Sequence, residues 1–568
     1  MSAPAVLVVG AGPSGLVAAL ELSRRGVAVR IVDAAPGPAT TSRAVATHAR
    51  TLEVYASLGL LDAVLARGRQ VRAFTVHQNG RQLVRIGADY SHLPTRTPFS
   101  LLIEQVDTEA VLREAVARHG VRIEWGCRLT ELRQDADAVT VQLRHTTDTG
   151  GREGAARGAG FGERVEQLTV PWLVGADGGH STVRSVLGLA LQGDSSETWL
   201  IADAQVHGAL PDDSLHWLRT SRGAVMAIPL RAPGRFRLLD TADTSQSDDP
   251  DVVAARFAAK LSAGSGLPVT VEPPSWVSVF TIQQRMIERM RVGRCFVVGD
   301  AAHVHSPASG QGMNTGIQDA VNLGWRLAAV VAGHAGPGVL DGYDAERVPV
   351  GAHLLKATRT ATTLIQARSR LLATALPALF AVVRTVPRLK GRIERKIMSG
   401  MSALDLSYPT VAAAADALVP VGAPPGASSG AVTVRPEPGE RVTRVDAEDA
   451  RDPGWQAVLA EATDPRWTLL LLPDHEGADP LGEALAERHA AWLSVLSLPP
   501  GLGDAVRTGL QVSGDGWLLV RPDGCLAARG EHLAAETFEQ LAQTLLDRPP
   551  TGSATGSTNP EELAWTSV

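Results

Sequence analysis

Two glycine-rich segments, one at the start of the chain and one beyond its middle, constrain the possible folds most strongly. The first reads VLVVGAGPSGLVAALELSRRGVAVRIVD over Val6 to Asp33, and the second reads VVGDAAHVHSPASGQGMNTGIQDAVNL over Val297 to Leu323. In each, an apolar run ends at glycine and a helical pattern follows, which predicts a buried strand, a turn and a helix. We therefore expect one α/β unit that the chain leaves and later re-enters.

The first segment predicts a βαβ unit, with a strand over 5–10, a helix over 13–25 and a second strand over 27–32. In a Gly-x-Gly-x-x-Gly turn the backbone can approach a pyrophosphate, and the helix N-terminus offers it free N–H groups. Asp33, which ends the second strand, is placed to bind ribose hydroxyls. The alternative is a purely structural glycine turn, and the motif fits FAD and NAD equally well. The residues expected to meet the dinucleotide at this turn are Gly10, Gly12, Pro13, Ser14 and Gly15.

Two other segments can contribute to the same site. Residues 175–184 read GADGGHSTVR, a strand end, a glycine turn and a helix start, which taken alone is also well explained as a structural turn. In the later segment a predicted strand ends at Asp300, whose carboxylate can accept hydrogen bonds from a polyol such as a ribityl chain. The helix that follows begins near Gly312, Met313 and Asn314, and its N–H groups can stabilise negative charge on a reduced flavin ring.

Composition and spacing argue against several other classes. The net charge of -6 disfavours nucleic acid as a partner, because phosphate binding needs a basic surface. The three cysteines are far apart, so disulfides and structural zinc are not expected. A cytoplasmic location is expected. His303 and His305 are two residues apart in a loop, so no metal site is expected there. The apolar stretch 371–383 is too short to span a bilayer, so no membrane span is expected.

The Gly-x-Gly-x-x-Gly, Asp-Gly-x-x-Ser-x-x-Arg and Gly-Asp segments, in this order, resemble those of the single-component FAD-dependent aromatic hydroxylases, the para-hydroxybenzoate hydroxylase-like family (group A flavoprotein monooxygenases). The resemblance covers about residues 5–400. The later part, with RPDG at Arg521 to Gly524, resembles the thioredoxin-like extension of phenol and aromatic polyketide hydroxylases, but it carries no pair of redox cysteines. We therefore expect the extension to be structural.

The expected fold is α/β, with a Rossmann-like FAD-binding domain interleaved with a mostly antiparallel substrate sheet, long helices and a C-terminal thioredoxin-like domain. The 568 residues are too many for one domain, and alternating apolar residues between 196 and 285 predict the separate sheet. The expected division is an FAD-binding domain of residues 1–75, 100–195 and 286–345, a substrate-binding sheet domain of 76–99 and 196–285, a helical segment 346–417, a linker 418–440, a thioredoxin-like domain 441–548 and a disordered tail 549–568.

The resemblance implies roles for the matching residues. Asp33 is expected to hold the adenosine ribose, Arg43 the pyrophosphate and Gln105 the FAD chain, with Leu129 beside the adenine. The turn at Asp177 and the side chain of Arg184 are expected to serve both FAD and a transient NAD(P)H. The remaining implied roles are the ribityl chain for Asp300, the flavin ring for Gly312, Met313 and Asn314, and the reacting edge of the flavin, as the catalytic position, for Pro307.

The implied reaction is oxygenation. NAD(P)H reduces FAD, O2 then gives a flavin C4a-hydroperoxide, and this hydroxylates a phenolic or polycyclic aromatic substrate of polyketide type. Candidate substrate residues are His48, Trp217, Met226 and Pro229, although core packing explains the last three equally well and a solvated helix face explains His48. The alternatives are a Baeyer–Villiger or antibiotic-modifying, rifamycin-type flavin monooxygenase and a non-catalytic flavin-binding redox sensor. A homodimer is the assembly considered.

Overall fold

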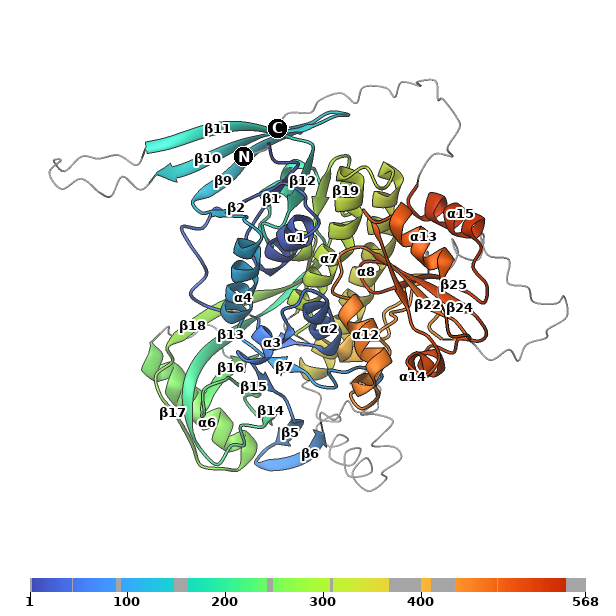
Figure 1. The fold of residues 1–568 in the computed structure, drawn as a ribbon. Coiled ribbons are helices and arrows are strands. Elements are labelled where there is room, and N and C mark those ends of the chain that lie inside the picture. The colour runs from blue at the N-terminus through green and yellow to red at the C-terminus, as the bar shows by residue number, and fades with distance from the viewer. Residues whose placement is uncertain are drawn as a thin grey trace.

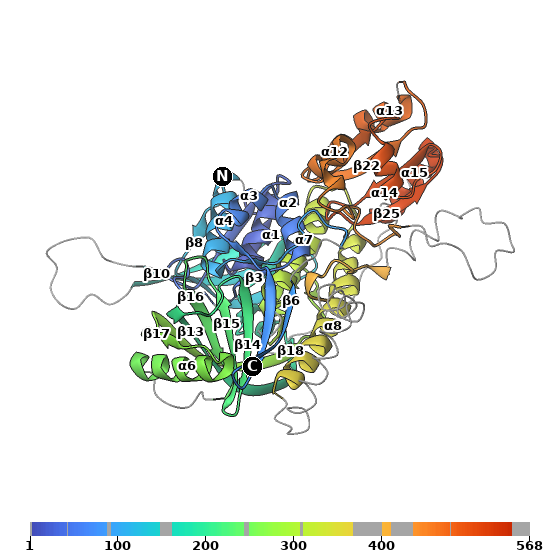
Figure 2. The ribbon, with the colours of Figure 1, turned by 90° about the horizontal axis from the view of Figure 1, so that it is seen from below.

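The computed structural model describes residues 3–42, 44–87, 93–147, 162–242, 249–306, 310–366, 400–409, 435–477 and 479–547. It confirms the expected α/β fold: the part expected to bind the nucleotide, from here on called the nucleotide-binding part, lies at the centre, with a large mixed sheet on one side and a C-terminal α/β unit on another (Figures 1 and 2). Several predictions lie outside the described residues. These are Arg43, Pro307, the apolar stretch 371–383, residues 367–399 and 410–417 of the helical segment, the linker up to residue 434 and the tail 549–568.

The two glycine-rich segments meet in one central sheet of order β19-β20-β12-β1-β2-β8. β12 lies between the strands of the two segments and pairs in parallel with β1 on one side and β20 on the other. The chain thus re-enters its first sheet, as expected. The strands are β1 (Val6–Val9), β2 (Val29–Val32), β8 (Ile123–Glu124), β12 (Trp172–Gly175), β19 (Arg291–Val292) and β20 (Cys295–Val297).

Both faces of the central sheet are covered, which is why β1 is a continuous apolar run. Val6 and Val8 belong to a core with the helices α1 (Pro13–Ser23), α4 (Gln105–Arg118) and α7 (Gly312–Val331). Leu7 and Val9 point the other way, into a core with the small antiparallel sheet of β9 (Cys127–Gln134), β10 (Val139–Thr147) and β11 (Gly162–Val170). This small sheet forms the top of the molecule in Figure 1.

The mixed sheet has the order β21-β18-β13-β16-β15-β14-β5-β6. It is antiparallel as predicted except where β5 pairs in parallel with β14. One face packs on helix α6 (Pro250–Ser265), and the other turns toward the nucleotide-binding part. Its strands are β5 (Ala73–Gln78), β6 (Arg81–Gly87), β13 (Gln192–Gly208), β14 (Ser214–Thr220), β15 (Gly223–Pro229), β16 (Arg235–Asp240), β18 (Trp276–Met286) and β21 (His303–Val304), and β17 (Val269–Val271) pairs with β13.

The C-terminal unit is built on a sheet of order β23-β22-β24-β25, in which β22 and β23 are parallel and the other pairs antiparallel. Its strands are β22 (Trp467–Leu472), β23 (Leu493–Ser497), β24 (Gly516–Val520) and β25 (Leu526–Gly530), and its helices are α12 (Pro453–Glu461), α13 (Pro480–Arg488), α14 (Asp504–Gly509) and α15 (Ala535–Leu545). Cys525, the single cysteine of this unit, is buried.

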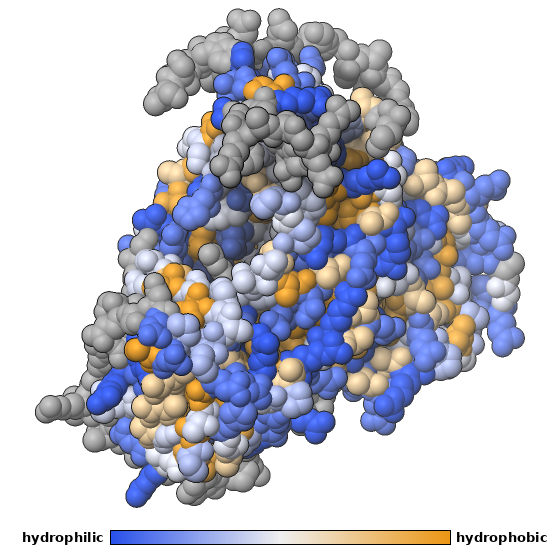
Figure 3. All heavy atoms as spheres, turned by 90° about the vertical axis from the view of Figure 1, so that its left-hand side faces the viewer, coloured by the Kyte–Doolittle hydropathy of each residue, from blue (hydrophilic) through white to orange (hydrophobic). Residues whose placement is uncertain are grey.

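On the face drawn in Figure 3, apolar side chains lie in separate groups among polar ones. Within the described ranges, no helix is both long enough and apolar enough to cross a membrane.

The C-terminal unit is fixed to the rest of the chain through a buried carboxylate. Glu346, on helix α8 (Asp341–Gln366), accepts hydrogen bonds from Arg326 of α7 at 2.6 Å and from both terminal nitrogens of Arg521 at 2.7 and 2.9 Å. Trp325 packs beside both guanidinium groups and shares a core with Trp467 of β22. Burial raises the pKa of Glu346, but the two guanidinium groups outweigh it and hold the pKa well below its usual range.

Replacing Arg521 with Met should destabilise the protein by about 3–5 kcal/mol, because it removes one of the two guanidinium groups that bind buried Glu346 and breaks the ion pair of buried Asp523. The Arg521 side chain also pairs with Asp523, so two carboxylates lose a cation. Urea unfolding followed by tryptophan fluorescence measures the effect. Arg488→Met, which removes a largely exposed pair with Glu539, is the control and should change stability by no more than about 1 kcal/mol. Equally small losses of stability in both variants would contradict the role of Arg521 as a cation that balances buried carboxylates.

The charge of Glu346 also predicts a pH dependence. Because its pKa is lowered in the folded protein, its contribution is complete at neutral pH and is lost as the pH falls below the unfolded value of about 4.3. Glu346→Gln carries no charge at any pH. The gap in melting temperature between wild type and Glu346→Gln should therefore be large at neutral pH and narrow on acidification. A gap that stays constant through a pH series would show that the charge is not what stabilises the fold.

Candidate active site

A cavity of about 890 Å³ lies between the nucleotide-binding part and the mixed sheet. On one side its wall is made by the turns of the three glycine motifs, and on the other by apolar side chains of the sheet. We number the motifs in chain order: the first begins at Gly10, the second at Gly175 and the third at Val297. Segments that are far apart in sequence therefore meet at one site. The wall residues from the motifs are Gly12, Pro13, Ser14, Ala176, Gly178, Gly179, His180, Val298, Asp300, Gly310, Gly312 and Met313.

The first motif places its acidic residue beside the glycine turn. Asp33 accepts hydrogen bonds from the amides of Ala11 at 2.6 Å and Ala35 at 2.7 Å, so its carboxylate is held at the carboxyl end of β2 next to the turn. Gly10 has a φ of +106°, and a Cβ there would lie 2.3 Å from the carbonyl oxygen of Ala176. Only glycine fits where the first and second motifs touch.

Strand β9 begins against the same edge, since the Cys127 amide donates to the carbonyl oxygen of Asp33 at 2.8 Å. Leu129, two residues further, is buried in the core beneath the small sheet and does not line the cavity. Gln105, at the start of α4, lies on the wall and accepts from the amide of Ala44 at 3.3 Å.

In the second motif the turn faces the cavity and the acidic side chain does not. Asp177 accepts hydrogen bonds from the amides of Thr182 at 2.7 Å and Val183 at 3.1 Å, and so caps helix α5 (Thr182–Val186). Arg184 donates to the carbonyl oxygens of Gly179 at 2.9 Å and Ala301 at 3.1 Å, which ties the second motif to the third. Neither side chain is on the cavity wall. Burial lowers the pKa of Arg184.

The third motif brings its carboxylate to the cavity. Asp300 lies in the short turn η1 (Gly299–Ala301), is exposed and lines the wall. A Cβ at Gly299 or at Gly316 would lie 2.4 Å from the hydroxyl oxygen of Ser14, so η1, α7 and the start of α1 are in direct contact. The strand end and both helix N-termini thus converge on one face of the cavity.

At the start of α7, Asn314 fixes a neighbouring loop. Its side-chain oxygen accepts from the amide of His48 at 2.9 Å, and its nitrogen donates to the carbonyl oxygens of Ala46 at 2.9 Å and Gly310 at 2.8 Å. Asn314 is buried and off the wall, whereas its neighbours Gly312 and Met313 are on it. The imidazole of His48 lines the cavity, with Nδ1 2.9 Å from the hydroxyl oxygen of Ser100.

Sequence reasoning missed a buried charge network behind this loop. His303 Nε2 lies 2.7 Å from Asp319 of α7, whose other oxygen accepts from Arg347 at 2.7 Å, and His305 Nε2 lies 3.0 Å from His303 Nδ1. Burial raises the pKa of Asp319, but Arg347 and His303 outweigh it and bring it to about 2. Burial lowers the pKa of His305 to about 3. His303 is thus held by a carboxylate of α7.

The sheet side of the cavity is mostly apolar. Trp217 of β14 and Met226 of β15 line it, whereas Pro229, which ends β15, does not. Arg237 is the charged exception: it makes two 2.8 Å bonds to Asp203 and had no sequence signal, because its partner is on another strand. Further wall residues that the sequence did not single out are Phe74, Ile86, Ile201, Leu215, Ile228, Leu239, Phe280, Thr281, Gln283 and Met401.

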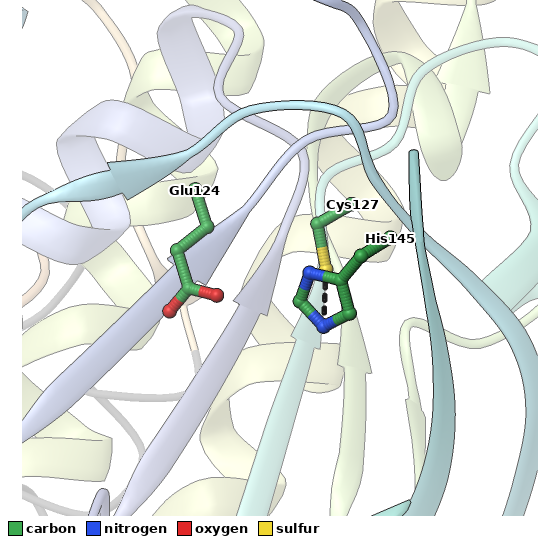
Figure 4. Close-up of side chains that lie close together, drawn as sticks. All are labelled: Glu124, Cys127 and His145. Atoms are coloured by element: carbon green, nitrogen blue, oxygen red, sulfur yellow. Dashed lines mark hydrogen bonds between the residues drawn. The ribbon is translucent and has the colours of Figure 1, made fainter. Parts of the chain in front are cut away.

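A second group of polar residues lies at the outer strand β8 of the central sheet, and none of them is on the cavity wall. Cys127 Sγ is 3.8 Å from His145 Nε2, and the carboxylate of Glu124 lies to one side of this pair (Figure 4). Arg30 binds Glu124 at 2.7 Å and Glu166 at 2.6 Å, and burial raises the pKa of the Cys127 thiol to about 11. A metal ion would have to displace this cation and deprotonate that thiol, so the group is an ion-pair cluster.

The sequence was compared with known proteins. Residues 4–358 match the model of the family described as FAD binding domain. The 6-methylpretetramide 4-monooxygenase of Streptomyces rimosus is 48% identical over 552 residues, which is 95% of this chain and 93% of that protein. The 12-dehydrotetracycline 5-monooxygenase/anhydrotetracycline 6-monooxygenase of the same species is 32% identical over 91% of this chain and 94% of that one. A rifampicin monooxygenase of Streptomyces venezuelae is 38% identical over 63% of this chain and 71% of that protein.

Solved structures give the same result. The flavin-dependent monooxygenase PieE, in complex with FAD and substrate, superposes with a TM-score of 0.74 at 25% identity over 97% of this chain and all of that one. OxyS anhydrotetracycline hydroxylase from Streptomyces rimosus gives 0.68 at 28% identity over 96% of this chain and 99% of that one. The non-catalytic redox-sensor alternative is thereby set aside. The chain belongs to the FAD-dependent aromatic hydroxylases and is a FAD-dependent monooxygenase.

Proposed function

We propose that the protein hydroxylates a phenolic ring of a polycyclic aromatic polyketide, with NAD(P)H as electron donor and O2 as oxidant. The observation that carries this proposal is the two-sided cavity, with nucleotide-type turns on one wall and a broad apolar sheet on the other. A flat, largely apolar substrate gains binding free energy when its surface is buried against Trp217, Met226 and Phe280. The similarity to a 6-methylpretetramide monooxygenase over nearly the whole chain supports the polyketide class.

The residues present fit FAD. A Cβ at Gly12, Gly178 or Gly312 would meet no protein atom within 4 Å, so each of these positions opens onto space that a ligand can fill. We assign the pyrophosphate to the Gly10–Gly15 turn, with Arg43, and the adenosine ribose to Asp33. Asp300 is assigned to the ribityl hydroxyls, and the N-terminus of α7 to the flavin ring. When bound, the flavin supplies hydride and oxygen chemistry.

The protein's own task is to position the substrate and to exclude water. The apolar sheet wall excludes water, while Asn314 and Arg184 hold the loops that face the flavin by binding their backbone carbonyls. The described residues include one dinucleotide-binding turn, in the first motif, so NAD(P)H is assigned to a transient position near the Asp177–Gly179 turn. Pro307 is assigned to the reacting edge of the flavin. A cytoplasmic enzyme, monomeric or homodimeric, fits the proposed function.

A Baeyer–Villiger or rifamycin-type oxygenation is the second candidate, favoured by the similarity to a rifampicin monooxygenase. That similarity covers 63% of this chain, whereas the 6-methylpretetramide monooxygenase aligns with 95% of it. The C-terminal unit therefore favours the polyketide hydroxylase.

Purified holoenzyme should oxidise NAD(P)H faster when a polycyclic phenol is added, and the product should gain one oxygen atom with its rings intact. A panel of phenols, polycyclic quinones and rifampicin, with product mass and fragmentation recorded, tests this. A product with an inserted ring oxygen or an opened ring would favour the second candidate. Absence of any oxygenated product across the panel would overturn both.

Asp300→Ala should weaken FAD binding about 10- to 100-fold, because hydrogen bonds to a charged group contribute about 1.5–3 kcal/mol. Flavin content of the purified protein and titration of the apoprotein with FAD measure this. Asp504→Ala, at an exposed position of the C-terminal unit, is the control and should retain wild-type occupancy. Full flavin occupancy in Asp300→Ala would refute the ribityl assignment.

A further inference from the structure

The sheet side of the cavity is completed by a residue from far along the chain. Met401 lines the cavity and packs in the apolar cluster that contains Trp217, Met226 and Leu404. It lies in residues 400–404, which we call the cavity strap. The match to the FAD-binding family model ends at residue 358, so the strap lies beyond the residues that this model covers. The wall of the substrate cavity therefore includes a segment that this family match does not describe.

One end of the strap is fastened to the flavin-facing loop. The side-chain nitrogen of Gln311 donates to the carbonyl oxygen of Gly400 at 2.8 Å. Gln311 is the N-cap residue of α7 and lies between Gly310 and Gly312, both on the cavity wall. This hydrogen bond joins the strap to the loop assigned to the flavin ring.

The other end is fastened to the C-terminal unit. Nε of Arg441 donates to the carbonyl oxygen of Leu404 at 3.1 Å, Nη1 pairs with Glu53 at 2.9 Å, and Nη2 donates to the carbonyl oxygen of Pro94 at 2.6 Å. Arg441 is 2% exposed, so these bonds form away from water, where they are stronger. Glu53 is on helix α2 (Ala49–Ser57), whose N-cap residue is His48. One cation thus holds the strap, α2 and the loop before β7 (Leu101–Leu102) together.

The backbone of the strap is held in a conformation that it would not adopt alone. Ala403 has a φ of +57°, in the left-handed region that a residue with a Cβ enters at a cost. The amide of Leu404 donates to the hydroxyl oxygen of Ser402 at 3.2 Å across this turn. The turn directs the carbonyl of Leu404 to Arg441 while Met401 faces the cavity, so the two fastened ends determine where Met401 lies.

We propose that the strap determines which substrates the cavity accepts: Met401 contacts the distal rings of a polycyclic substrate, and Arg441 is the positioning residue that holds it there. The proposal rests on the proposed function, because it assumes an aromatic ligand beside the flavin. Methionine suits this place, since its flexible thioether side chain adapts to flat apolar surfaces and packs well on aromatic rings. The C-terminal unit, which has no redox cysteine pair, thereby acquires a role in substrate selection.

The test measures ligand binding to oxidised holoenzyme through the change in flavin absorbance, so it needs no turnover. The ligands are phenol, the three-ring dye alizarin and the four-ring anhydrotetracycline. Met401→Ala should weaken binding of the four-ring ligand about 10-fold by removing apolar contact, and Met401→Phe should weaken it at least as much by filling the space. Phenol binding should not change in either variant. Met401→Leu, which conserves volume, is the matched control and should keep the wild-type ratio of affinities.

Arg441→Met tests the positioning role. It should lower the affinity for the four-ring ligand relative to phenol, and its effect should be non-additive with that of Met401→Ala, because both act on one contact. Arg529→Met is the control: its guanidinium binds Pro436, Leu510 and Gln511 within the C-terminal unit, so it should lower the melting temperature and leave the ratio of affinities unchanged.

Equal effects of the Met401 variants on all three ligands, or none on any, would overturn the proposal. If Arg441→Met does not fold, Gln311→Met can be used, because it removes the hydrogen bond from Gln311 to Gly400 at the other end of the strap. An unchanged ratio of four-ring to phenol affinity in Gln311→Met would also contradict the proposal. The proposed function fails separately, when wild-type enzyme oxygenates no member of the aromatic panel. A wild-type enzyme that hydroxylates polycyclic phenols while its Met401 variants keep the wild-type affinity ratio refutes the strap alone.

Discussion

The position of β12 between β1 and β20 is the constraint on which the rest of the structure depends. Gly175 ends β12 beside Val9 on one side and Val297 on the other, so three parallel strands finish at one edge. Ligands of open α/β sheets bind beyond the carboxyl ends of their strands. Here that edge carries the three turns that form one wall of the cavity, and each comes from a different part of the sequence. Without this pairing the Gly-x-Gly-x-x-Gly turn would face an incomplete site.

The local patterns of the sequence predicted this arrangement well. An apolar run followed by glycine and a helix is a short-range signal, and it places the three strand ends and the helix that starts near Gly312 correctly. Predictions that depended on where one side chain points were less complete. Asp177 and Asn314 stay predicted cofactor residues, and their side chains bind backbone groups of the protein and lie off the cavity wall. A motif shows which residues gather, whereas the direction of each carboxylate or amide depends on which buried N–H or C=O group needs a partner.

The sequence did not predict the ion pairs between residues that are far apart in the chain, and the reason is different. Glu346 and Arg521 are 175 residues apart, and Asp203 and Arg237 lie on neighbouring strands whose register the sequence does not reveal. Periodicity reports which face of an element is buried, and it carries no information on which charge lies opposite. The same holds for Met401, which comes from a short segment whose contact with the cavity depends on three-dimensional closure of the chain. A wrong pairing of such residues would leave a buried charge without solvent or partner, which is costly.

Helix α7 connects the cavity with the apolar core of the C-terminal unit. It runs from Gly312 at the cavity to Val331, a rise of about 30 Å for a helix of this length. Near its far end Trp325 lies in the same core as Trp467 and Trp517 of the C-terminal unit. The stability of the cavity end of α7 and the stability of the tryptophan core are therefore coupled through one continuous helix. A ligand that binds the folded protein at the first turn of α7 and does not bind the unfolded chain would therefore also stabilise the distant tryptophan core against unfolding.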